Sequence, residues 1–115
     1  MELIITENSI QNDLGLLNYE IDNNCIIVNS LDAFEKRCGI GSSLVKRLEE
    51  LSNEKNISLI EVTASPTYEA ISFWFAMNYK PATKEDKIYC NKLFKSNNER
   101  IETNSGVIVF NKKFK

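Results

Sequence analysis

Apolar positions in the first third of the chain fall into short runs that predict β-strands. Residues 3–6 predict a short edge strand, whereas the polar segment 8–13 predicts a turn. Residues 14–21 alternate loosely between apolar and polar positions, and residues 25–31 are apolar and β-branched. Asp22-Asn23-Asn24 separates the two runs. Because Asp and Asn favour turn conformations, the two runs predict an antiparallel hairpin.

The apolar period lengthens after Leu31, where a helix is predicted. Leucines recur at helical spacing from Leu44, and charged residues occupy the other side of the same segment. The glycine-containing segment 39–43 opens this helix, and Asn56 is a plausible stop. Residues 57–64 follow as a short run that is apolar on both faces and β-branched, which is typical of a buried parallel strand.

A second helix is predicted next, with Ser65 as its cap and Pro66 at its first position. It is expected to end before Pro81. The segment 82–105 is polar apart from a short apolar patch, and residues 107–110 predict a closing strand. This order of elements predicts an α/β sheet with at least one right-handed parallel crossover.

Composition restricts the chemistry. The 115 residues predict one domain. The net charge of −2 does not favour binding to nucleic acid or to anionic lipid. The chain has no histidine, which excludes Ser-His-Asp and Cys-His nucleophile systems. The three widely spaced cysteines predict reduced thiols rather than a disulfide framework or a zinc site, so no metal is expected.

The N-terminus lacks the basic start and the apolar stretch of a signal peptide, and no apolar run approaches the length of a membrane span. The expected location is therefore the cytoplasm, with no membrane partner.

Candidate chemistry is concentrated in the strand–loop–helix segment 31–41. Gly39 and Gly41 lack side chains where an anion would approach the backbone, and the helix behind them supplies free N–H groups and a positive dipole end. Lys36 and Arg37 add positive charge. The segment does not match the Rossmann or the Walker pattern. Gly-x-Gly alone fits equally well a helix start at which the glycines only allow backbone flexibility and bind no anion.

The segment Lys36-Arg37-Cys38-Gly39-Ile40-Gly41, followed by Ser-Ser-Leu-Val, resembles the Arg/Gln-x-x-Gly-x-Gly/Ala signature of the GNAT acetyltransferases. A second GNAT pattern, Asn-x-x-Ala-x-x-Phe-Tyr-x-x-x-Gly-Phe, is matched in spacing by Thr67, Ala70, Phe73, Trp74, Asn78 and Tyr79.

The resemblance covers residues 14–81 and the closing strand. It implies a single acyl-CoA N-acyltransferase domain over residues 1–115, of the α/β class. Its mixed, mostly antiparallel central sheet would contain a splayed parallel strand pair, flanked by helices. Only thirty residues precede Leu31, so the usual N-terminal strand and helix pair is expected to be missing, and this shortening is compatible with a homodimer.

The resemblance also implies acetyl-CoA as cosubstrate. Loop amides would hold the pyrophosphate, and the Leu31 N–H would polarise the thioester carbonyl and stabilise the oxyanion. The coenzyme-binding residues that it implies are Leu31, Asp32, Ala33, Lys36, Arg37, Cys38, Gly39, Ile40, Gly41, Ser42, Thr67, Phe73 and Trp74. Packing in the core is an equally good interpretation of Phe73.

Two departures from the family concern the proton transfers. Trp74 replaces a tyrosine that in many members protonates the leaving thiolate, although a thiol with a pKa of about 8.5 can leave as thiolate and take a proton from water. Without histidine, the base that deprotonates an amine must be a carboxylate, a tyrosine or ordered water. Glu61 and Asp32 are candidates, and both also fit the role of a surface or loop carboxylate.

The sequence thus predicts an N-acetyltransferase in which an amine attacks acetyl-CoA directly. The acceptor is not specified: a protein, a small amine and an antibiotic all fit. One alternative is a coenzyme-binding regulatory module without turnover, and another is an interaction protein without coenzyme.

Overall fold

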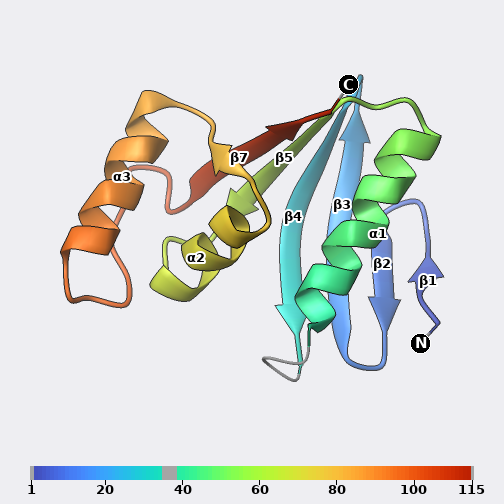
Figure 1. Ribbon diagram of the computed structural model, residues 1–115, viewed down its shortest axis with the longest axis horizontal. Helices are drawn as coiled ribbons and strands as arrows, with labels where there is room; N and C mark the ends of the chain where they lie inside the picture. Colours follow the sequence, from blue (N-terminus) through green and yellow to red (C-terminus); the bar gives the residue numbers. More distant parts are fainter. Residues whose placement is uncertain (1, 35–38, 115) are drawn as a thin grey trace. The chain divides into compact units, whose positions relative to one another are not determined.

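A computed structural model of the chain describes residues 2–34 and 39–114 (Figure 1). In this described part, seven strands form a mixed, mostly antiparallel sheet with one parallel pair, and three helices accompany it. The predicted fold class is confirmed. The residues group into two compact units, one of residues 1–60 with 113–115 and one of residues 61–112. A single domain over the whole chain stays a prediction.

The first unit is built on four consecutive antiparallel strands: β1 (Ile4–Ile5), β2 (Ser9–Asn12), β3 (Gly15–Asp22) and β4 (Cys25–Ala33). The predicted edge strand and hairpin are confirmed. The turn predicted over residues 8–13 is wrong, because β2 occupies most of that segment. Ile10 anchors this strand, since its side chain is fully buried while the residues after it are polar.

A β-bulge divides β4. Asn18 pairs with Ser30, but the next residue, Tyr19, pairs with Val28, so Asn29 is an extra residue on β4. Directly paired residues share a face of a sheet, and Leu31 pairs with Leu17, which is fully buried. The bulge therefore brings Leu31 onto the buried face despite its odd spacing from Val28.

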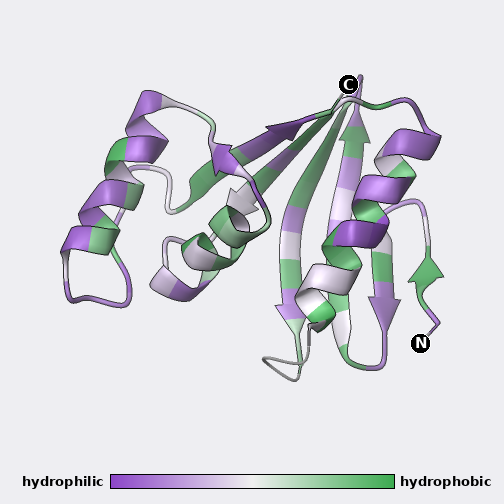
Figure 2. Ribbon diagram, in the orientation of Figure 1, coloured by the Kyte–Doolittle hydropathy of each residue, from purple (hydrophilic) through white to green (hydrophobic). Residues whose placement is uncertain are grey.

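Helix α1 (Ile40–Glu54) covers the face formed by β2, β3 and β4 (Figure 1). Its polar positions lie on the side away from the strands, as the colouring of Figure 2 shows. On this exposed side Arg47 pairs with Glu50 at 3.5 Å and Glu54 at 3.4 Å. The predicted helix is confirmed, and its buried residues are Ile40, Leu44, Val45, Leu48, Leu51 and Ser52.

The second unit starts within the predicted buried strand, which is confirmed as β5 (Leu59–Ala64). The remaining elements are α2 (Tyr68–Ala76), β6 (Lys80–Pro81), α3 (Lys84–Lys95) and β7 (Ile108–Lys113), with β6 antiparallel to β7. The helix ending before residue 81 and the closing strand are confirmed.

The prediction of Ser65 as the helix cap is wrong, because Thr67 caps α2. The polar segment 82–105, for which no helix was predicted, contains α3. The Thr67 hydroxyl accepts a hydrogen bond from the Ala70 N–H at 3.2 Å, which satisfies one of the donors at the helix start. The Thr83 hydroxyl does the same for α3, accepting from the Asp86 N–H at 3.1 Å.

Candidate functional site

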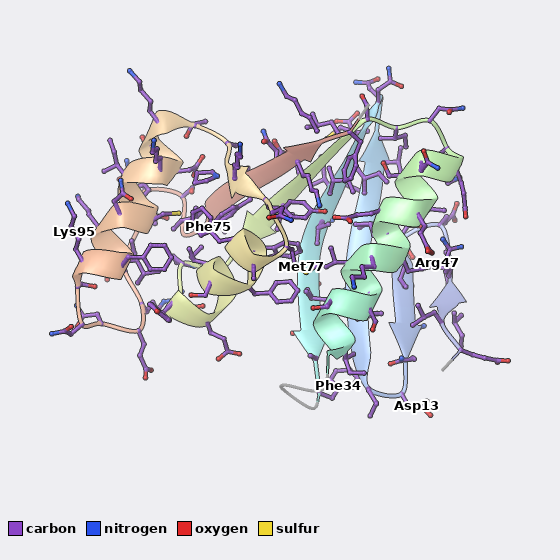
Figure 3. The ribbon with its side chains drawn as sticks, viewed as in Figure 1. Asp13, Phe34, Arg47, Phe75, Met77 and Lys95 are labelled. Atoms are coloured by element: carbon purple, nitrogen blue, oxygen red, sulfur yellow. The ribbon has the colours of Figure 1, made fainter. Side chains whose placement is uncertain are left out.

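The predicted site lies where β4 leads into α1. The structure describes Leu31, Asp32 and Ala33 at the end of β4, and Gly39, Ile40, Gly41 and Ser42 at the start of α1. Lys36, Arg37 and Cys38 lie outside the described residues. Phe34 follows β4, and Figure 3 shows its side chain near Asp13 at the same end of the first unit.

The backbone at the end of β4 has a defined orientation. The Phe34 N–H donates to the Leu14 carbonyl at 2.8 Å. Hydrogen-bonded and non-hydrogen-bonded pairs alternate along an antiparallel ladder. Leu31, opposite Leu17, and Ala33, opposite Gly15, therefore direct their N–H and C=O groups to the edge of β4 that faces away from β3.

The start of α1 exposes backbone donors. Gly39, the residue before the helix, has φ 74° and ψ 11°, a left-handed conformation that glycine adopts without steric cost. Its carbonyl accepts from the Ser43 N–H at 3.0 Å and from the Ser43 hydroxyl at 2.9 Å. Among the described residues, no side chain caps the helix start and no acidic residue lies in its first turn. The N–H groups and the positive dipole end there suit an anion.

Gly15, which was not predicted from the sequence to be a site residue, determines how closely α1 approaches the strands. A Cβ at this position would lie 2.7 Å from Ile40 Cγ2, 3.0 Å from Leu44 Cδ1 and 3.0 Å from the Asp32 carbonyl oxygen. Real Cβ atoms essentially never come as close as 2.7 Å to such a neighbour. A glycine in a strand signals that some neighbouring group approaches closely, but it does not show which element does so.

The predicted site residues of the second unit lie at the start and middle of α2. Thr67 is its cap, and Phe73 is half-buried. Trp74 is only 4% exposed, and its ring packs edge-to-face against Phe73 and Tyr79, with centroids 5.0 Å away in both cases. The contacts of these three residues with a coenzyme stay predictions.

The two candidate bases belong to different units. Asp32 is exposed at the end of β4, and Glu61 is half-buried on β5. Their roles as bases stay predictions.

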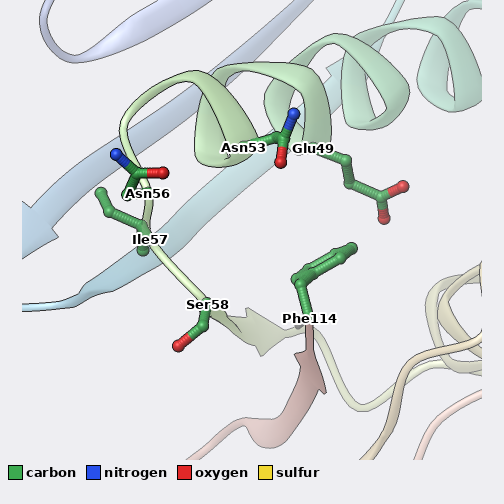
Figure 4. A pocket seen from close by; sticks show the side chains of 6 residues that line it. All are labelled: Glu49, Asn53, Asn56, Ile57, Ser58 and Phe114. Atoms are coloured by element: carbon green, nitrogen blue, oxygen red, sulfur yellow. The ribbon is translucent and has the colours of Figure 1, made fainter.

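A cavity of about 160 Å³ lies at the other end of α1 (Figure 4). None of the predicted site residues that the structure describes lines it; the lining consists of Glu49, Asn53, Asn56, Ile57, Ser58 and Phe114.

Over residues 2–34 and 39–114, no three Cys, Asp or Glu side chains lie together in a way that could hold a metal ion. Within the described residues, Cys25 and Cys90 are not joined by a disulfide. None of the helices in the described ranges is both long and apolar enough to span a membrane.

No protein-family model matches the sequence, and no curated protein matches it by sequence. Solved structures match its fold. The PaiA N-acetyltransferase of Thermoplasma acidophilum, in complex with coenzyme A, matches with a TM-score of 0.63 and 15% identity over 92% of this chain. A Bacillus anthracis protein classed as a streptothricin acetyltransferase, in complex with acetyl coenzyme A, matches with a TM-score of 0.68 and 15% identity over 97% of this chain. The chain has the GNAT acetyltransferase fold.

The chain spans 58% of the length of the Thermoplasma N-acetyltransferase and 67% of the Bacillus protein. A third match, the anti-CRISPR protein AcrVA5, has a TM-score of 0.62 and 17% identity over 88% of this chain. In that case the match covers 94% of the other protein. The resemblance to the GNAT proteins is thus confirmed at the level of the fold.

Proposed function

We propose that the protein is an acetyl-CoA-dependent N-acyltransferase that acetylates a primary amine. The observation that carries the proposal is the helix start after Gly39, where backbone donors have no side-chain cap among the described residues and no acidic neighbour in the first turn. Two proteins of similar fold are in complex with coenzyme A or acetyl coenzyme A. The features of the first unit fit such a molecule.

The fit concerns two parts of the cosubstrate. The N–H groups of Ile40, Gly41 and Ser42 hold the pyrophosphate, because the helix dipole and the missing Cβ atoms favour close approach of an anion. The backbone groups of Leu31 and Ala33 point away from β3 and bond the amides of the pantetheine arm.

Acetyl-CoA supplies an activated acyl group as a thioester. The Leu31 N–H donates to the thioester carbonyl oxygen and polarises it. The acceptor nitrogen forms the new C–N bond as the C–S bond breaks, and the departing sulfur takes its proton from water. Glu61 or Asp32 removes the proton from the amine, since the chain has no histidine.

Isothermal titration calorimetry with acetyl-CoA tests the loop. The Gly41→Val variant places a branched side chain where the pyrophosphate lies, and we expect it to weaken binding by about tenfold or more, which corresponds to about 1.4 kcal/mol. Lys46→Val, an exposed position further along α1, is the matched control and should bind as the unmodified protein does. Unchanged affinity in a folded Gly41→Val variant would contradict the assignment of the loop.

Coenzyme A release in the presence of a panel of amines tests turnover. A second candidate function, a coenzyme-binding module without turnover, is favoured by Trp74, because an indole N–H cannot protonate a leaving thiolate. Binding of acetyl-CoA without release against protein, small-molecule and aminoglycoside amines would support that second function. Absence of binding would contradict both.

A further inference from the structure

Three aromatic side chains of the second unit form an exposed cluster. Tyr68, Phe75 and Phe94 are 53%, 37% and 42% exposed. The Phe94 ring lies 5.6 Å from the Tyr68 ring and 5.7 Å from the Phe75 ring, measured between centroids. Contiguous exposed aromatic surface of this kind is typical of protein interfaces, where aromatic residues are enriched.

A groove of about 630 Å³ adjoins this cluster at Phe75. It is formed by the end of α2, by β6 and by α3, and its lining consists of Phe75, Asn78, Tyr79, Lys80, Pro81, Lys87, Cys90 and Asn91. The groove therefore combines an apolar lining with two lysines.

The charged side chains that line the groove are all positive. Lys80 and Lys87 are both exposed, and no acidic residue is among the described residues that line it. The Cys90 thiol is neutral at physiological pH, because burial and then the nearby Asp86 raise its pKa to about 11. The chain as a whole carries a net charge of −2, so a basic groove is not simply a reflection of overall composition.

Two acidic residues at the start of α3, Glu85 and Asp86, are not part of the groove lining. Asp86 is buried and accepts hydrogen bonds from the Thr83 hydroxyl at 2.6 Å and the Val109 N–H at 3.0 Å. Glu85 lies two residues before Lys87, a spacing that places the two side chains on different sides of a helix. Lys95 extends the positive charge at the end of α3, and Figure 3 shows it projecting from this helix.

We infer that the groove and the adjoining aromatic cluster form a docking site for an acidic segment of a partner protein. An aromatic or aliphatic side chain of that segment occupies the apolar lining beside Phe75 and Pro81. Its carboxylates pair with Lys80 and Lys87. A single nucleic acid strand fits less well, because the exposed rings pack edge-to-face or tilted and do not offer the open faces on which successive bases stack.

A random copolymer of glutamate and tyrosine is a suitable probe, with fluorescence anisotropy as the measurement. We expect the full-length protein to bind it, and to bind poly-glutamate more weakly because that polymer lacks an apolar anchor. The double variant Lys80→Glu/Lys87→Glu should weaken binding of the copolymer by about tenfold or more, because like charges then face each other. Binding should also weaken as salt is raised.

The matched control is Lys46→Glu/Lys92→Glu, which reverses two exposed lysines that do not line the groove. Its affinity should stay within about twofold of the unmodified protein, with circular dichroism confirming that both variants are folded. Equal loss in both double variants, no binding of the copolymer, or tighter binding of single-stranded oligothymidine would each overturn the inference. So would a dimer of the chain in sedimentation experiments that disappears in the Lys80→Glu/Lys87→Glu variant, since the occupant would then be a second copy.

Discussion

Gly15 on β3 lies directly against Ile40 at the start of α1, so closely that a Cβ on the glycine would come within 2.7 Å of Ile40 Cγ2. Gly15 also pairs with Ala33 across the ladder, which places the contact at the end of β4. The missing side chain thus allows three parts of the first unit to meet: the two strand ends and the first turn of the helix. The predicted pyrophosphate loop connects two of these parts.

Gly15→Ala should therefore destabilise the first unit and displace the helix start. Forcing an extra methyl group into a packed site costs typically about 1–3 kcal/mol. We expect a loss of that size in the free energy of unfolding measured by urea denaturation. If the loop binds acetyl-CoA, calorimetry should also show weaker binding, because the first turn of α1 moves.

The control is the double variant Gly15→Ala/Ile40→Ala, which removes the atom that the new methyl group would meet. The cost of Gly15→Ala should be smaller in the Ile40→Ala background than in the unmodified protein. Equal costs in the two backgrounds would show that Ile40 is not the residue that limits this position.

The conformation of Gly39 leads to a second prediction. Among the described residues, no heavy atom lies within 4 Å of a Cβ built on Gly39, whereas its φ of 74° is a conformation that side chains other than glycine rarely adopt. Gly39→Ala should destabilise the protein by about 1 kcal/mol, and Gly39→Asn by less, because Asn tolerates the left-handed region better. Thermal unfolding of the two variants shows which of them is the more stable. An alanine variant as stable as the asparagine variant would contradict it.

The fold was predictable where apolar residues recur often enough to define a period. The hairpin and α1 meet this condition, because each carries several buried apolar side chains. Strand β2 does not, since Ile10 is its only apolar residue. Helix α3 was missed for a related reason: its buried positions are Asp86, Cys90 and Leu93, of which one is charged. The threonine cap and the acidic first turn of α3 were available as signals.

The site was predictable only in part. The position of the loop follows from glycines between a strand and a helix, which are local features of the sequence. The role of Gly15 depends on which helix packs over β3. The face of the sheet on which the Leu31 side chain lies depends on the bulge at Asn29. Neither can be obtained from a local pattern, because both arise from the pairing and packing of segments that are distant along the chain.

The buried Cys90 gives a prediction for pH dependence. Its pKa is raised from 9.0 to about 11, first by burial and then by Asp86. The unfolded chain therefore loses the thiol proton at a lower pH than the folded chain. This contribution to stability is complete below about pH 9 and is lost as the pH rises towards 11. Urea denaturation should show a smaller loss of stability over this range in Cys90→Ala than in Cys25→Ala. Identical slopes in the two variants would contradict the raised pKa.

The two helix caps of the second unit separate a structural role from a binding role. Thr67 caps α2 and is also a predicted coenzyme-binding residue, whereas Thr83 caps α3 and is not. Replacing either threonine with alanine should cost about 1 kcal/mol in the free energy of unfolding, because each loses a hydrogen bond to the helix start. Only Thr67→Ala should also weaken acetyl-CoA binding in calorimetry, and Thr67→Ser should retain both properties. If Thr67→Ala lowers stability and leaves the affinity unchanged, Thr67 acts as a cap alone, because a hydroxyl that also bonded the pantetheine arm could not be removed without a cost to binding.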